Sequence, residues 1–196
     1  MRGFLAFIGF LAIVVAIAAA AFFFGGFYSV AGTADNPAAI DWALVNIRQA
    51  SIARQATDTP PGTLDTPAAV QAGAKAYSER GCTNCHGAPG VEWGKWSEGL
   101  RPDPPDLKEI VPHRQARELF WVVKNGINMT GMPSFKLAGV DDPEIWDIVA
   151  FIRKLPTVTE QDFKSWTAAA PASAPTPTPT PTPAPGGSAP SPAPPP

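Results

Sequence analysis

The feature of this sequence that most constrains its fold is a pair of cysteines followed directly by a histidine. Cys82 and Cys85 are separated by two residues, and His86 comes next. This C-x-x-C-H pattern is the attachment signature of a c-type haem. Each thiol can add across one vinyl group of the porphyrin, and the histidine then lies where a ring nitrogen can bind the iron. The pattern therefore predicts a chain that folds around a covalently bound haem.

Three other interpretations of the pattern stay open on the residues alone. A structural zinc site needs four Cys or His ligands, and in a chain with two cysteines and two histidines the remaining candidate is the distant His113. A thioredoxin-like redox pair needs a βαβ setting, and residues 70–100 show no strand-like alternation. A plain disulfide between Cys82 and Cys85 leaves His86 without a role.

The second axial ligand of a haem iron sets its chemistry, and the candidates here are His113, Met129 and Met132. Gly131 lets the backbone approach the porphyrin closely, and Pro133 stiffens the loop just after Met132. Both properties favour Met132 over Met129 as the ligand. The alternative role for these methionines is core packing, and His113 is expected on the surface at a helix entry.

Residues from about 66 to 155 resemble a class I monohaem cytochrome c of the short bacterial type. The matching elements are Gly81–Gly87, Asn125-Gly126, Gly131-Met132-Pro133 and a final helix over 142–152. His86 precedes Met132 by 46 positions, a separation similar to the family pattern. The resemblance covers somewhat under half of the chain.

The resemblance implies an all-α cytochrome c fold around one haem c. It assigns Cys82 and Cys85 to covalent attachment, and His86 and Met132 to the two axial positions of the iron. A six-coordinate iron leaves no open site for oxygen or peroxide, so an electron-transfer protein is expected rather than an enzyme. The family also suggests that a proline within 102–105 lies near His86, with a nearby carbonyl accepting its Nδ1 hydrogen. The sequence does not single out which proline.

The N-terminal segment predicts a membrane anchor. Phe4 to Phe24 is a run of 21 residues without a charge, which as a helix is about 31 Å long and spans the hydrocarbon layer. Arg2 before it places the N-terminus in the cytoplasm. We therefore expect a single-pass protein of the bacterial inner membrane with its haem domain in the periplasm. A cleaved secretory signal is the alternative, with small residues at 18–21 and 32–34.

Composition divides the chain into four segments. They are an N-terminal transmembrane anchor or signal segment (1–28), a juxtamembrane helix and linker (29–65), the cytochrome c domain (66–156) and a Pro/Ala/Thr-rich disordered tail (157–196). Of the 24 prolines, 12 fall in the last 29 residues, which predicts an extended chain without a core.

Apolar spacing predicts the helices. Residues 40–52 suggest an amphipathic helix near the membrane with Trp42 at the interface. In the domain, Thr66 caps a first helix, whose Gly73 suggests a close crossing with the last helix. A second helix runs from about 114 to 125, and a third begins with Asp142 as its cap and ends before Pro156. Residues 87–112 lack a regular pattern, which indicates a long loop around the haem.

The leading functional hypothesis is a membrane-tethered shuttle between a quinol-oxidising complex and a terminal oxidase. The alternatives are a dedicated cytochrome subunit of a dehydrogenase or respiratory complex and, as a different class, a haem-based sensor. From Pro67 to Pro156 there are 11 basic and 11 acidic residues without a basic stripe, so nucleic acid is not an expected partner. The sequence leaves the donor, acceptor, reduction potential and oligomeric state open.

Overall fold

The computed structural model describes residues 2–27 and 29–168, and every named element in that part of the chain is helical. In order, the elements are α1 (Arg2–Phe24), α2 (Ala38–Gln55), α3 (Pro67–Glu79), α4 (Thr83–His86), η1 (Lys95–Gly99), α5 (Leu107–Ile110), η2 (Val111–His113), α6 (Ala116–Asn125), α7 (Asp142–Lys154), η3 (Leu155–Thr157) and α8 (Glu160–Thr167). The prediction of an all-α fold is confirmed. The predicted long loop over 87–112 contains the short elements η1, α5 and η2.

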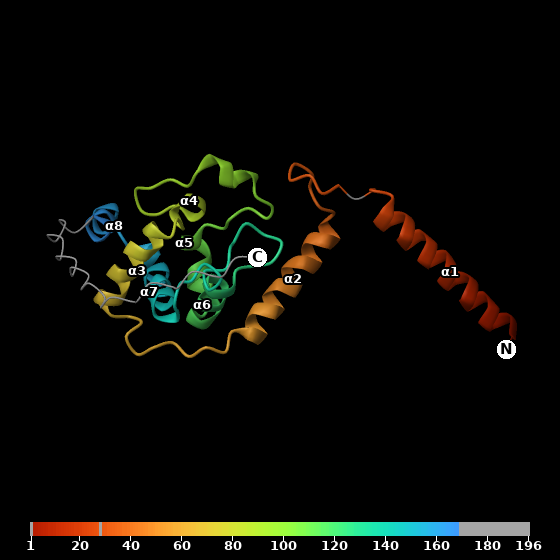
Figure 1. Cartoon of the computed structure of the whole chain (residues 1–196), viewed down its shortest axis with the longest axis horizontal. Helices are drawn as coiled ribbons and strands as arrows, with labels where there is room; N and C mark the ends of the chain where they lie inside the picture. The colour runs from red at the N-terminus through yellow and green to blue at the C-terminus, as the bar shows by residue number, and fades with distance from the viewer. Residues whose placement is uncertain (1, 28, 169–196) are drawn as a thin grey trace, which may run out of the picture.

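The core of the domain forms where α3 crosses α7 (Figure 1). The buried side chains include Ala69, Val70 and Tyr77 on α3, and Ile145, Ile148, Val149 and Ile152 on α7. A Cβ on Gly73 would overlap the backbone carbonyl of Asp147. The close crossing predicted at Gly73 is therefore confirmed, and only a residue without a side chain fits there.

Local capping determines where the helices begin. Thr66 caps α3 as predicted. The cap of α7 is Asp141 rather than Asp142, because the Asp141 carboxylate accepts the hydrogen bond from a first-turn N–H. Helix α6 begins two residues later than predicted. Its cap is Gln115, whose N–H donates to the Glu118 carboxylate at 3.0 Å in a capping box.

Helix α6 is joined to α7 by an aromatic stack and an ion-pair network. The rings of Phe120 and Trp146 are stacked at 3.9 Å between centroids. Beside them, Lys124 Nζ lies 2.7 Å from the carboxylate of Asp142 and 3.7 Å from that of Asp58. Because Asp58 belongs to the segment between α2 and α3, Lys124 ties that linker to the domain.

The prediction of a disordered segment from residue 157 onward is wrong for residues 157–168. Helix α8 starts with a capping box in which the backbone N–H groups of Thr159 and Asp162 are each bonded to the other residue's side chain at 3.1 Å. Phe163 is 4% exposed and stacks on Phe151 of α7. The strong proline bias farther along the chain obscured this short helix. Residues 169–196 lie outside the described residues.

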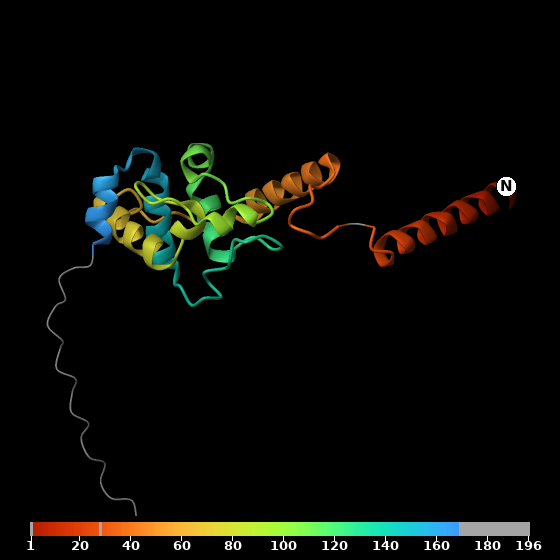
Figure 2. The same cartoon turned by 90° about the horizontal axis from the view of Figure 1, so that it is seen from above.

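Two helices precede the domain (Figures 1 and 2). By length and composition α1 can cross a membrane, and none of its side chains is buried. A secretory signal passes the same test. Helix α2 exceeds the predicted 40–52 at both ends and packs against α6, with Ile52 buried. Trp42, at the other end of α2, is 70% exposed.

Candidate functional site

The C-x-x-C-H residues form one tight turn directly after α3. Cys82 follows Gly81, whose φ of +77° ends α3, and the remaining motif residues make up α4. The N–H of His86 donates to the carbonyl of Cys82 at 3.0 Å. Gly87, with a φ of +62°, then turns the chain away. The turn brings two thiols and one imidazole together after the end of α3, a helix with one buried face.

Both cysteines are free thiols, so the disulfide alternative does not hold in this structure. Burial raises the pKa of the Cys82 thiol to about 12, and burial also raises the pKa of Cys85. Burial lowers the pKa of His86, an effect partly offset by its hydrogen bond with Pro105. At neutral pH the turn therefore presents two neutral thiols and a neutral imidazole.

The imidazole of His86 is oriented by a backbone carbonyl. Its Nδ1 lies 3.1 Å from the carbonyl oxygen of Pro105. Because a carbonyl oxygen can only accept, this contact requires a hydrogen on Nδ1, which leaves the lone pair of Nε2 free. The family resemblance suggests a proline within 102–105 near His86 and a nearby carbonyl as acceptor, and in the structure this carbonyl is that of Pro105. The bond fixes both tautomer and ring direction, as expected for a metal-binding histidine.

The zinc and thioredoxin alternatives lack their structural settings. In the described part of the chain, no three His, Cys, Asp or Glu side chains gather into a site able to hold a metal ion. His113 is exposed in the short element η2. No strand occurs among residues 2–27 and 29–168, so the cysteines lie outside any βαβ unit.

The predicted methionine loop lies between α6 and α7. It starts at Gly126, where a Cβ would come within 2.6 Å of the Pro133 backbone. The N–H of Ile127 donates to the carbonyl of Met132 at 3.1 Å, and the N–H of Met132 donates to the Thr130 hydroxyl at 3.1 Å. These bonds close the loop into a compact unit around Met132.

The two candidate methionines have different surroundings. Met132 is half-buried and packs against the hydrophobic core, whereas Met129 is 91% exposed at a positive φ of 60°. Gly131 lies close to Leu100, since a Cβ on Gly131 would come 2.6 Å from the end of the Leu100 side chain. This contact joins the methionine loop to the loop that follows the cysteines.

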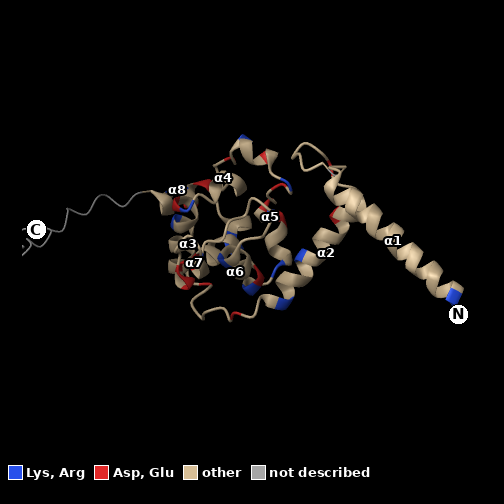
Figure 3. Cartoon of the chain, turned by 45° about the vertical axis from the view of Figure 1, so that its right-hand side comes forward, with Lys and Arg blue, Asp and Glu red and all other residues tan. Residues whose placement is uncertain are grey.

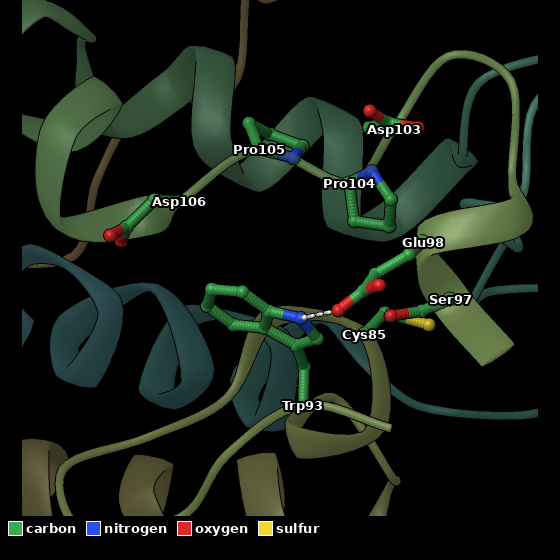
Figure 4. A pocket seen from close by; sticks show the side chains of 8 residues that line it. All are labelled: Cys85, Trp93, Ser97, Glu98, Asp103, Pro104, Pro105 and Asp106. Carbon is green, nitrogen blue, oxygen red and sulfur yellow. Dashed lines mark hydrogen bonds between the residues drawn. The ribbon is translucent and has the colours of Figure 1, made fainter. Parts of the chain in front are cut away.

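A cavity of about 170 Å³ opens beside the Cys85 thiol (Figure 4). Its other lining residues are Trp93, Ser97, Glu98 and the run Asp103–Asp106. The indole of Trp93 lies across it, with Nε1 donating to the Glu98 carboxylate at 3.4 Å. The cavity is too small to hold a whole porphyrin ring. Pro105, which orients His86, borders the same space.

The match to known protein families falls on this part of the molecule. Residues 68–152 match the model of a family described as cytochrome c oxidase, cbb3-type, subunit III. This stretch is a c-type cytochrome domain. The match runs from the start of α3 almost to the end of α7, and α8 lies beyond it. Searches among curated proteins and among solved structures found no match.

A cytochrome domain of this type holds haem c covalently and transfers electrons, and is not catalytic by itself. The donor set at the turn suits such a group. It offers two thiols not joined to each other, an imidazole with Nε2 free and, from a separate loop, a half-buried thioether. Acidic and basic residues are interspersed along the helices and loops of the cytochrome domain (Figure 3).

Some contacts of the cytochrome domain could not be read from the sequence. Helical spacing puts Tyr77 on the apolar face of α3, yet its buried hydroxyl donates to the carbonyl of Gly87 at 2.9 Å. Leu100 contacts the methionine loop, and nothing in the sequence indicates this contact. Helical spacing tells which face of a helix is buried but gives no partner for the polar end of a side chain.

Proposed function

We propose that this protein is a membrane-tethered one-electron carrier with one haem c. Cys82 and Cys85 are the attachment residues, and His86 and Met132 are the axial ligands of the iron. The observation that carries the proposal is the contact of Nδ1 of His86, in the C-x-x-C-H turn, with the carbonyl of Pro105 in the following loop. This contact leaves Nε2 as the free donor of a ring that is already oriented.

Each residue of the site has a separate task. The thiols of Cys82 and Cys85 supply the sulfur atoms of two thioether bonds. His86 supplies a nitrogen ligand whose donor strength is raised by the Pro105 carbonyl. Met132 supplies a soft sulfur ligand on a loop closed by its own hydrogen bonds. The haem, when bound, supplies an iron couple that exchanges one electron, and a His/Met ligand pair raises its potential.

We propose the following layout of the chain. Residues 1–28 anchor it in the inner membrane, 29–65 hold α2 and the linker, and 66–156 are the cytochrome domain in the periplasm. Helix α8 then belongs to the folded unit, and the proline-rich tail follows it. The length and composition of α1 support the anchor. The packing of α2 against α6 supports a domain held at a restricted distance from the membrane.

The redox partners are proposed as respiratory complexes, with the protein passing electrons from a quinol-oxidising complex to a terminal oxidase. The second candidate is a dedicated cytochrome subunit of a dehydrogenase or respiratory complex. The family description, which names a subunit of an oxidase, favours this candidate. Stable co-purification of a complex from detergent-solubilised membranes supports the subunit. Isolation of the chain alone, with reduction by a quinol-oxidising complex, supports the shuttle.

The attachment proposal is tested by maturation in cells with complete haem-ligation machinery. We expect the intact chain to gain the mass of one haem and to show a c-type pyridine haemochrome spectrum. The matched control replaces both Cys82 and Cys85 with alanine and must lose both signals. A colourless wild-type chain without the added mass contradicts the proposal. Carbon monoxide binding by the reduced wild-type protein would instead favour the sensor hypothesis.

A further inference from the structure

Tyr77 is bonded to both ends of the haem-attachment turn. Its backbone carbonyl accepts the N–H of Cys82 at 3.1 Å, just before α4. Its side-chain hydroxyl donates to the carbonyl of Gly87 at 2.9 Å, just after α4. Tyr77 therefore hydrogen-bonds to both residues that flank α4, namely Cys82 and Gly87. Because Tyr77 is fully buried, water does not replace these bonds.

The Tyr77 ring is connected to α8 through Phe151. Phe151 of α7 lies 5.1 Å from it between ring centroids. Phe163 of α8 stacks on Phe151 with 5.6 Å between the ring centroids. The exposed fractions are 0% for Tyr77, 0% for Phe151 and 4% for Phe163. The three rings make a continuous buried path from α8 to the carbonyl of Gly87.

Helix α8 also contacts the segment after the turn directly. A Cβ on Gly90 would meet the Cγ and Cδ atoms of Glu160, so the Glu160 stem covers this backbone. The segment is a small hairpin in which Ala88 and Val91 exchange hydrogen bonds at 2.8 and 2.9 Å. Two separate contacts thus connect α8 to the residues that follow His86.

We propose that Tyr77 is a positioning residue for His86 and that α8 is the brace that keeps Tyr77 in place. Helix α8 lies outside the stretch that matches the cytochrome family. The brace is thus a feature of this chain beyond the matched domain. Through the Gly87 carbonyl, the Tyr77 hydroxyl fixes the backbone that carries the imidazole. The proposal rests on His86 being an iron ligand.

The first test uses Tyr77→Phe, which removes one hydroxyl and leaves the ring packing intact. We expect the hyperfine-shifted ring protons of His86 in the oxidised protein to move. We also expect the midpoint potential to fall. Without the hydroxyl, the Gly87 carbonyl dipole is no longer offset, and a more negative local field favours the oxidised iron. If the potential changes while methionine still binds the iron, the effect comes from the positioning of His86 and not from a general loss of structure.

The second test truncates the full chain after Val158, which removes α8 together with the tail. The matched control is truncated after Ala168 and removes the tail alone. We expect faster amide hydrogen exchange in residues 82–91 and shifted His86 signals only when α8 is missing. Phe163→Leu, which keeps an apolar side chain but loses the stack, is expected to give the same changes to a smaller degree. It also keeps the test valid if the shorter chain does not fold.

The outcomes separate the two proposals. Wild-type protein without covalent haem overturns both. Wild-type protein with haem, but with His86 signals and potential unchanged in Tyr77→Phe, overturns the positioning role alone. Exchange that rises equally in α6 and in residues 82–91 after loss of α8 shows a general stabilising role and overturns the brace.

Discussion

Gly73 of α3 lies so close to Asp147 of α7 that the space for its side chain is taken by the Asp147 carbonyl. The two helices that carry most of the core are packed backbone to backbone at this point. Since α3 leads directly into the cysteine turn and α7 follows the methionine loop, the crossing sets the relative position of the two halves of the site.

Gly73→Ala is expected to destabilise the protein. The added methyl group has to push α7 away, which costs about 3 kcal/mol at a tightly packed crossing. Urea denaturation of the haem-loaded protein measures this as a lower midpoint. The control is Gly62→Ala, where a Cβ meets no atom within 4 Å. Equal midpoints for Gly73→Ala and wild type would contradict the prediction.

Met132→Ala is expected to abolish the long-wavelength thioether-to-iron charge-transfer band of the oxidised protein. Met129→Ala is the matched variant and is expected to retain the band, because Met129 is 91% exposed whereas Met132 packs on the core. Absorption spectra of both variants decide the assignment. A band that survives Met132→Ala and disappears in Met129→Ala assigns the sulfur ligand to Met129 instead.

Loss of the covalent haem is expected to leave the domain largely unfolded. A domain of about 90 residues has a marginal core by itself, and a bound porphyrin adds a large apolar surface to it. The variant with both Cys82 and Cys85 changed to alanine is measured by far-ultraviolet circular dichroism. Helix α1 contributes to the spectra of both proteins, so the variant is compared with the wild type in the same detergent. A native-like spectrum with a cooperative melt counts against the prediction.

Asp147 is expected to make stability depend on pH. Burial, together with the nearby Glu144 and Asp141 carboxylates, raises its pKa above 3.8. The folded state therefore binds the proton more tightly than the unfolded chain does. Its contribution to the free energy of unfolding is greatest below the ordinary pKa and is lost as pH rises through the raised value.

Asp147→Asn removes this titration. At neutral pH the variant is expected to be more stable than the wild type, by about 0.5 kcal/mol because the side chain is partly screened by solvent. The difference shrinks as pH falls from the raised pKa of Asp147 towards 3.8 and is smallest below that value. Denaturation midpoints of both proteins over the acidic range measure the effect. A difference that is constant with pH would exclude titration of Asp147 as its cause.

The sequence allowed the main elements of the cytochrome domain to be predicted because their signals are local. Capping by Thr66 depends on residues a few positions away, and so does the end of α6 at Gly126. Gly73 is informative because a glycine within an apolar helical stripe has few explanations other than close packing. Helix α8 was missed because its signals span eight residues at the edge of a proline-rich segment.

The sequence by itself determined that Cys82, Cys85 and His86 act together, because C-x-x-C-H is the attachment signature of a c-type haem. Tertiary structure alone decided which carbonyl meets His86 and which hydroxyl holds Gly87. Along the chain, Pro105 is 19 residues from His86, and Phe163 is 12 residues from Phe151. Such contacts depend on how α3, α7 and α8 pack together, and packing is set by the fit of whole side chains in three dimensions rather than by spacing along the chain.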